Sequence, residues 1–332
     1  MTRRTFFISL AFLLMLTMGA GGALAANWKM GHIRPDGMPE DLASRELADR
    51  VRELTQGKLQ ITVYPSSQLG DWTVVQQRIS MGAVEMALQP QDSQVDKRLS
   101  ILFFPYLFTS LEQVKRNMEP NSPFRKEVEA LFMKQRILPL AFWPSFFGGI
   151  GLKTLPDIWD RPKASKGMKI RVPNDPSFVT NVQAMGYLAT PIPFSDTFPA
   201  LQTGIVDGLI GTGVVGYYSN FRDLIKYYLP LNDHLEIYTV MVSLDAYEKL
   251  DEDTRTKLRQ AGSEMEKKRY QTFHTDEENY RKKLEEAGIK IMPVTDAIIA
   301  KFAEVAKKEC WPELANKIDK AYIERVLSLI VQ

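Results

Sequence analysis

The chain has 332 residues, of which 45% are hydrophobic and 25% are charged. This length allows one large domain or two smaller ones, and the composition is that of a globular protein rather than a disordered or collagen-like chain. The formal net charge of +2 gives no basic footprint for nucleic acid, so we expect no nucleic-acid partner. The single cysteine, Cys310, excludes an internal disulfide and a cysteine-based zinc site, and we expect it to be a packed thiol.

Residues 1–25 have the three parts of a secretory signal peptide. Arg3 and Arg4 precede an apolar run from Phe6 to about Met18, and residues 23–25 (Ala-Leu-Ala) form a cleavage motif of small residues. The apolar run is shorter than the ~20 residues that a membrane-spanning helix needs. We therefore predict cleavage near Ala25 and a periplasmic mature protein. The arginine pair leaves both the twin-arginine and the general secretory route open.

Strands and helices alternate along the rest of the chain. Buried or alternating apolar segments predict strands at 27–33, 59–64, 84–88, 168–172, 187–192, 205–210 and 239–243. Amphipathic segments predict helices that open at Pro39 and Gly70 and helices over 175–185, 198–203 and 217–229. This alternation favours an α/β architecture with largely parallel sheets. Because the pattern occurs twice, it suggests two lobes.

A much longer helix is predicted between Asp251 and Gly288. Acidic residues 251–253 stabilise its N-terminus, apolar residues follow at helical spacing from Leu258 to Ala287, and no proline interrupts the run. At the rise of an α-helix it spans roughly 55 Å, which exceeds the diameter of one small domain. We therefore expect this helix to lie across both lobes.

A dinucleotide-type motif gives the strongest enzyme signal. Gly211, Gly213 and Gly216 match G-x-G-x-x-G after an apolar strand, and Asp233 follows at about the spacing of a ribose-binding acid. An exported nicotinamide-dependent oxidoreductase that uses residues 211–216 is therefore an alternative. However, two tyrosines follow the third glycine, where close helix–strand packing is needed, and an exported protein is far from the nicotinamide pool. We favour a glycine-rich turn at which the backbone approaches another segment closely.

No other catalytic or metal-binding motif is present in the sequence. His32, His234 and His274 are far apart, and there is no H-E-x-x-H, G-x-S-x-G or P-loop lysine pattern. We therefore predict no enzyme, no metal and no cofactor.

Five aromatic residues cluster beside glycine and proline in segments predicted to be loops. They are Trp72, Trp143, Phe146, Phe147 and Phe194. Ordinary core packing remains open for each of them. Aromatic residues at strand ends also suit a ligand pocket, since clefts form outside the carboxyl ends of strands in α/β sheets.

Three stretches resemble the substrate-binding proteins of TRAP transporters, the tripartite ATP-independent periplasmic uptake systems. They are 57–61 running into 64–70 (YPSSQLG), 166–173 (KGMKIRVP), and 190–194 (TPIPF) continuing through 200–208 (ALQTGIVDG). The resemblance covers essentially the whole mature chain. It implies a two-lobed periplasmic binding protein fold with hinge strands and a long helix that spans both lobes. The implied boundaries are 26–148 and 237–276 for lobe 1, and 149–236 and 277–332 for lobe 2.

The resemblance also implies site residues. The arginine of the K-I-R-V stretch pairs with a substrate carboxylate in this family, and this role falls on Arg171, whose planar guanidinium can bind a carboxylate through two hydrogen bonds. Phe194 matches a position that packs on the ligand. The complete expected ligand-binding set is Arg171, Phe194, Trp72, Trp143, Phe146, Phe147, Gln89, Gly211 and Asp207.

Two departures from the family pattern bear on the ligand. Family members that bind acidic sugars or dicarboxylates often carry a second arginine where this chain has residues 148–151 (GGIG), and an asparagine where it has Gly211. A single arginine against an apolar wall suits a monocarboxylate with a hydrophobic or aromatic body. A dicarboxylate would bury one charge without an evident partner.

The resemblance and the absence of enzyme motifs lead to one expected function. We expect a monomeric solute receptor that closes over an organic acid and delivers it to TRAP membrane permease subunits. A ligand-sensing subunit that couples to a signalling partner remains a further alternative.

Overall fold

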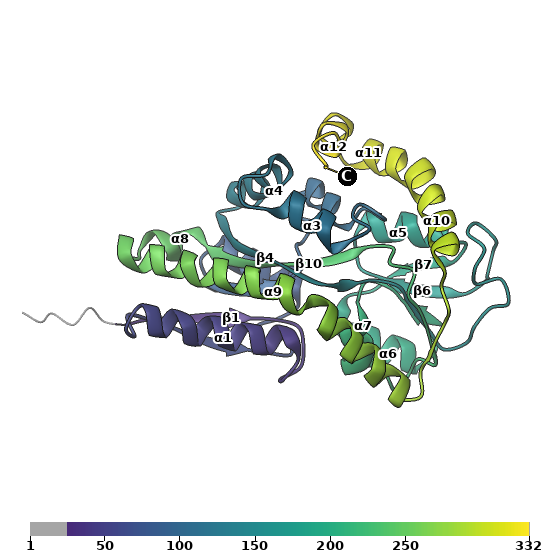
Figure 1. The fold of residues 1–332 in the computed structure, drawn as a ribbon, viewed down its shortest axis with the longest axis horizontal. Helices are drawn as coiled ribbons and strands as arrows, with labels where there is room; N and C mark the ends of the chain where they lie inside the picture. The colour runs from purple at the N-terminus through teal and green to yellow at the C-terminus, as the bar shows by residue number, and fades with distance from the viewer. Residues whose placement is uncertain (1–24, 332) are drawn as a thin grey trace, which may run out of the picture.

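The computed structural model describes residues 25–331. They form two lobes, each built on one β-sheet with helices packed around it (Figure 1). The predicted signal peptide lies outside the described residues, apart from Ala25. Within residues 25–331, no helix combines the length and apolar character that crossing a membrane requires.

The first sheet has the strand order β2-β1-β3-β10-β4. Its strands are β1 (Ala26–Gly31), β2 (Leu59–Tyr64), β3 (Met86–Gln89), β4 (Ile137–Phe147) and β10 (Leu235–Ser243). β1 pairs in parallel with β2 and β3, whereas β10 is antiparallel to both β3 and β4. The sheet is therefore mixed rather than largely parallel, because its last strand arrives from the other lobe.

Helices cover the first sheet and begin at recognisable capping residues. They are α1 (Pro39–Leu54), α2 (Trp72–Ser80), α3 (Leu111–Met118), α4 (Pro123–Lys134) and α8 (Leu244–Glu248). The side chains of Asp71, Ser110 and Ser122 accept hydrogen bonds from backbone N–H groups in the first turns of α2, α3 and α4. A proline occupies the start of α1 and of α4, where its missing N–H costs nothing.

The second sheet has the strand order β11-β9-β5-β8-β6-β7. Its strands are β5 (Ile150–Leu152), β6 (Lys169–Val172), β7 (Leu188–Pro191), β8 (Gly208–Leu209), β9 (Tyr227–Leu229) and β11 (Lys290–Ile291). β6 lies parallel to β7 and β8, and β5 lies antiparallel to β8 and β9. The helices of this region are α5 (Pro176–Ala184), α6 (Thr197–Gln202) and α7 (Val214–Gly216).

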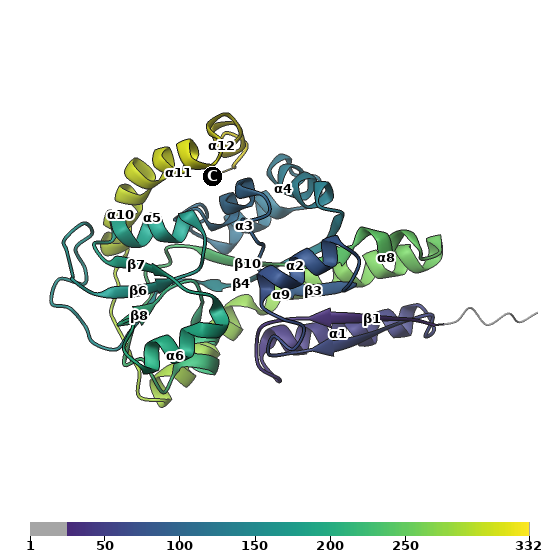
Figure 2. The ribbon, with the colours of Figure 1, turned by 180° about the vertical axis from the view of Figure 1, so that it is seen from behind.

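The C-terminal helices arch from the second lobe back toward α3 and α4 (Figure 2). They are α10 (Asp296–Val305), α11 (Trp311–Ile318) and α12 (Lys320–Leu327). Trp311 donates its indole N–H to the carbonyl of Pro105, and Asn117 on α3 exchanges hydrogen bonds with the backbone of Val331. The end of the chain therefore fastens the second lobe to the segment before α3.

The chain crosses between the sheets in two places and is joined across them by one long helix. β4 of the first sheet runs into β5 of the second, and β9 of the second sheet leads into β10 of the first. The 35-residue α9 (Glu252–Glu286) packs against α1 and β4 in the first lobe and against α7 and β11 in the second. This confirms the predicted helix across both lobes (Figure 1).

Two sequence predictions fail in this region. Residues 217–229, predicted as a helix, form only a short helical turn before β9. Residues 143–147, predicted as a loop, are the last five residues of β4. Pro139 and Pro144 argued against a strand in the sequence, because proline is rare inside sheets. Here β4 is an edge strand, and both prolines lie beside shifts in its register with β10.

Candidate ligand-binding site

A small cavity lies between elements of both lobes. It is lined by Ile33, Trp72, Pro90, Phe103, Arg171, Pro173, Phe178, Phe194, Gly211 and Glu236. Its volume of about 20 Å³ has room for roughly one water molecule. The cavity as described is therefore too small for a ligand of several carbon atoms.

Arg171 lies in this cavity with an unpaired charge. Its side chain, on β6, is 1% exposed, and its Nε donates to the carbonyl of Ile192 at 2.8 Å. Four guanidinium groups are buried in residues 25–331. Three of them contact a carboxylate: Arg34 with Glu236 at 2.9 Å, Arg125 with Glu266 at 2.7 Å, and Arg269 with Asp276 at 2.6 Å. Arg171 alone has no described carboxylate oxygen within 4.0 Å.

The electrostatics of Arg171 favour an anionic ligand. Burial lowers the pKa of this guanidinium to about 10, and the more distant Asp71 and Glu236 oppose the shift only in part. The group therefore remains protonated at neutral pH. A buried positive charge without a counterion is costly, and a carboxylate that fits its planar fork would compensate it.

The ring of Phe194 lies close to two guanidinium groups. It occupies a short turn after β7, and its ring centre is 5.8 Å from Cζ of Arg171 and 5.6 Å from Cζ of Arg34. The rings of Phe194 and Phe221 also meet in an edge-to-face arrangement, with their centres 5.9 Å apart. The face of an aromatic ring attracts cations, so Phe194 helps to fix the position of Arg171.

Trp72 lies on the first-lobe side of the cavity, and Gln89 supports it from behind. Trp72 is the first residue of α2 and lines the cavity directly. The side-chain amide of Gln89, at the end of β3, donates to the carbonyl of Trp72 at 2.6 Å. Gln89 is not itself a lining residue, and it holds the start of α2 in place.

The glycine motif at 211–216 serves close packing. Gly211 lines the cavity with φ +84°, and a Cβ atom there would lie 2.4 Å from Cγ of Pro173. At Gly213 a Cβ atom would lie 2.5 Å from Cβ of Phe146. The helix that follows, α7, continues as a helical turn over residues 217–221, and the bulky Tyr217 and Tyr218 come directly after Gly216, where a dinucleotide site needs close helix–strand packing. The geometry therefore fits the glycine-rich turn and not the oxidoreductase alternative.

The other predicted site residues do not line the cavity that holds Arg171. Trp143 packs on Arg269, with Cζ 4.3 Å from its ring centre, while Phe146 and Phe147 pack on Phe273 at 5.9 and 5.8 Å. The carboxylate of Asp207 accepts the backbone N–H of Lys169 at 2.8 Å. These contacts explain their positions as packing and sheet-edge residues, and a ligand role for them stays a prediction.

The two charged residues beside Arg171 at this cavity were not predicted, and neither were its lining residues Ile33, Pro90, Phe103, Pro173 and Phe178. Glu236 lines the cavity, and Arg34 contacts both Glu236 and Phe194. Arg34 and Glu236 are 202 positions apart in the sequence, and neither belongs to a local motif. Their pairing follows from the sheet order, which brings the end of β1 close to the start of β10.

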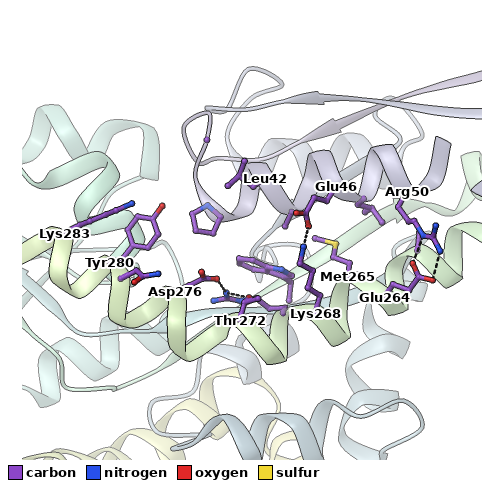
Figure 3. A pocket seen from close by; sticks show the side chains of 18 residues that line it. Leu42, Glu46, Arg50, Glu264, Met265, Lys268, Thr272, Asp276, Tyr280 and Lys283 are labelled. Atoms are coloured by element: carbon purple, nitrogen blue, oxygen red, sulfur yellow. Dashed lines mark hydrogen bonds and ion pairs between the residues drawn. The ribbon is translucent and has the colours of Figure 1, made fainter. Parts of the chain in front are cut away.

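A larger groove, of about 520 Å³, lies between α1 and α9 (Figure 3). Three of its four cations are paired with acids: Arg50 with Glu264, Lys268 with Glu46, and Arg269 with Asp276. The fourth, Lys283, is exposed and lies over the ring of Tyr280. The groove does not include Arg171. Because the buried cation of this groove is already paired and the unpaired Lys283 is exposed to solvent, which weakens its attraction for a carboxylate, we assign the acid-binding role to the smaller cavity.

Two further sequence expectations concern metals and Cys310. Within the part of the chain that the structure describes, no cluster of three His, Cys, Asp or Glu side chains is arranged to hold a metal. Cys310 is buried against the carbonyl of Thr180, and burial raises the pKa of its thiol to about 12. This confirms Cys310 as a packed, unreactive thiol.

The profile of the bacterial extracellular solute-binding protein family 7, DctP, matches residues 30–317. The chain belongs to this family. It is 26% identical over 272 residues to the sialic acid-binding periplasmic protein SiaP of Vibrio cholerae, covering 79% of this chain and 82% of that protein. It is 24% identical over 309 residues to the C4-dicarboxylate-binding periplasmic protein DctP of Rhodobacter capsulatus, covering 90% of this chain and 86% of that protein.

Solved structures of TRAP periplasmic solute-binding proteins share the fold. The protein of Chromohalobacter salexigens with bound D-glucuronate superposes with a TM-score of 0.83 at 21% identity, covering 91% of this chain and 99% of that chain. The galactonate complex of the sugar acid binding protein DctPAm from Advenella mimigardefordensis superposes with a TM-score of 0.84 at 20% identity. The match covers 92% of this chain and 98% of that chain. The DctP-family chain is therefore a two-lobed solute receptor of the TRAP type and not an enzyme. Receptors of this type are periplasmic, bind small organic acids and work with membrane permease subunits.

Proposed function

We propose that this receptor binds a monocarboxylate with an apolar or aromatic body between its two lobes. The observation that carries the proposal is the unpaired, buried guanidinium of Arg171 in a cavity shared by both lobes. A carboxylate on Arg171 would supply the missing counterion. The proposed ligand set is centred on Arg171, Phe194, Trp72 and Gly211.

The remaining wall of the cavity supports an apolar ligand body. Trp72, Phe103, Phe178 and Phe194 contribute aromatic surface, and Ile33 contributes aliphatic surface. Burying such surface against hydrocarbon stabilises a complex by about 25 cal/mol for each Å² removed from water. The relatives named for sialic acid, C4-dicarboxylates and D-glucuronate all bind acids, which supports the carboxylate but not the apolar body.

Ligand binding would be coupled to closure of the lobes. We place the moving bodies at 26–148 with 237–276, and at 149–236 with 277–332, joined by the two crossings β4–β5 and β9–β10. A ligand that contacts Trp72 on one side and Arg171 on the other stabilises the closed state, because only this state offers both contacts. The closed, monomeric receptor would then deliver its ligand from the periplasm to the permease.

The test is a thermal-shift and calorimetry screen of the protein lacking residues 1–25. The panel holds aromatic and branched monocarboxylates, sugar acids and dicarboxylates. A ligand at 100 times its Kd adds about 2.7 kcal/mol to the free energy of unfolding, which gives a clear rise in Tm. The proposal is supported if aromatic or branched monocarboxylates raise the Tm of the wild type and do not raise the Tm of Arg171→Met. Binding of dicarboxylates or sugar acids alone contradicts the apolar monocarboxylate and leaves the receptor assignment intact.

A further inference from the structure

The two lobes bring two carboxylates together where the segments after β3 and β6 meet. Asp92 follows β3 of the first sheet, and Asp175 follows β6 of the second. Each of these residues is 1% exposed. The two segments are in direct contact, since the side-chain amide of Gln94 donates to the carbonyl of Asn174 at 2.7 Å. Each lobe therefore contributes one buried acid to this contact.

The hydrogen bonds of the two acids differ. Asp175 accepts from the hydroxyl of Ser100 at 2.7 Å and from the backbone N–H of Ser177 at 2.7 Å, at the start of α5. Asp92 accepts the backbone N–H of Gln94 at 2.8 Å, but its Oδ2 atom is buried with no hydrogen-bond partner among the described residues. A buried, ionised carboxylate with so few donors is costly, so a proton is better placed on Asp92 than on Asp175.

The charges around Asp92 also favour its protonated form. Burial raises the pKa of Asp92, the hydrogen bond from Gln94 offsets this only in part, and the negative charges of Asp175 and Asp71 raise the pKa further. The cation of the adjoining cavity, Arg171, is attracted to Asp71 and Glu236. Within residues 25–331, no basic side chain lies within 4.0 Å of the Asp92 carboxylate.

Separation of the lobes would relieve this burial. The segments after β3 and β6 would lose their contact, water would reach both carboxylates, and the pKa of Asp92 would return toward its ordinary value of 3.8. The protonation of Asp92 and the angle between the lobes are therefore linked.

We propose that closure of the two lobes takes up one proton, which Asp92 holds in the closed state. This inference rests on the lobe closure of the proposed function but not on the identity of the ligand. The closed state binds this proton more tightly than the open state does. Its advantage is fully present below the open-state pKa and is lost as pH rises through the closed-state pKa. Between these values the ratio of closed to open receptor falls about tenfold for each pH unit.

The experiment measures the radius of gyration of the ligand-free protein lacking residues 1–25, by small-angle X-ray scattering between about pH 5 and pH 8. A closed receptor is more compact than an open one, so we expect the radius of the wild type to increase with pH. A radius that stays constant or decreases as pH rises overturns the inference. It leaves the receptor assignment and the proposed ligand standing, because the ligand screen tests these separately.

Asp92→Asn and Asp96→Asn form a matched pair of variants. Both aspartates accept the backbone N–H of the residue two positions on, and asparagine keeps this acceptor. Asp96, however, contacts Arg98 at 2.6 Å, and this pairing outweighs burial and lowers its pKa. Since asparagine cannot ionise, Asp92→Asn should stay compact at every pH, whereas Asp96→Asn should expand with pH as the wild type does. Expansion of Asp92→Asn with pH would assign the proton to another group, such as His234, and overturn the inference.

Discussion

The Cζ atom of Arg171 lies 5.8 Å from the ring centre of Phe194, on the wall of a cavity where no described carboxylate neutralises the arginine. A buried cation that contacts only an aromatic face and backbone carbonyls contributes little to the stability of the fold. Its value lies in what it can bind, so its removal should lower ligand affinity far more than it changes the stability of the fold.

Arg171→Met should abolish binding of the organic acid while leaving the free energy of unfolding within about 1 kcal/mol of the wild type, because no ion pair is broken. The matched control is Arg125→Met. Arg125 is also buried but contacts Glu266 at 2.7 Å, and its loss should cost about 3–5 kcal/mol. Urea denaturation and calorimetry measure the two effects. A loss of several kcal/mol in Arg171→Met would show an important partner for this cation within the protein itself.

Phe194→Leu should weaken ligand binding about fivefold to thirtyfold, since a cation–π contact is worth roughly 1–2 kcal/mol when desolvated and leucine keeps only the apolar bulk. Phe221→Leu serves as the control. The ring of Phe221 meets that of Phe194 in an edge-to-face arrangement at 5.9 Å but does not line the cavity. The Kd of the Phe221→Leu variant for the ligand should therefore change little. Equal effects of the two variants would indicate general loosening of this core rather than a role for the Phe194 ring.

Arg269→Met should destabilise the protein by about 3–5 kcal/mol, because its buried pair with Asp276 is broken. The same guanidinium donates to the carbonyls of Pro144 and Ser145 and so ties α9 to β4. The neighbouring Lys268 pairs with Glu46 at the surface, and Lys268→Met should change the free energy of unfolding by less than about 1 kcal/mol. Chemical denaturation of both variants tests this difference, and equal losses would refute it.

The buried pair of His234 and Asp233 should make stability depend on pH. Burial alone would lower the pKa of His234, but the Asp233 carboxylate 3.0 Å away and the charge of Glu236 together outweigh it, so the net pKa is raised above the ordinary value of 6.5. The folded state therefore holds the proton more tightly than the unfolded state. The resulting stability is fully present below pH 6.5 and is lost as pH rises through the folded pKa.

The measurement is the free energy of unfolding of the wild type and of His234→Asn between about pH 6 and pH 8. We expect the advantage of the wild type to shrink as pH rises. His274→Asn is the control, since His274 is exposed on α9. An advantage that grows with pH would mean that burial, and not Asp233, dominates the pKa of His234.

The sequence was most informative where structure depends on local spacing. The strand at 59–64 and the helix after Asp251 appear in the structure as β2 and α9 because alternation and helical periodicity are properties of neighbouring residues. Arg171 was identified by a family motif, and the structure places it in a cavity between the lobes.

The incorrect or missing predictions concern residues whose structure depends on contacts between distant segments of the chain. β4 contains two prolines that a local rule assigns to a loop, and they are accommodated only because β4 is an edge strand with register shifts against β10. Tyr227–Leu229 forms a strand because it pairs with β5. Glu236 was not predicted as a cavity residue, because its place there depends on its contact with Arg34 and on the pairing of β10 with β3.

The strand order of the first sheet also constrains the order in which the chain can fold. β4 has one partner in this sheet, β10, and β10 is synthesised only after every strand of the second sheet except β11. Until then, the apolar edge of β4 has no native partner, and such edges readily pair with other chains. A nascent or partly translocated chain that ends before residue 235 therefore cannot complete its first sheet. The first sheet, although it holds the N-terminal strand, is therefore completed only after most of the second lobe has been made.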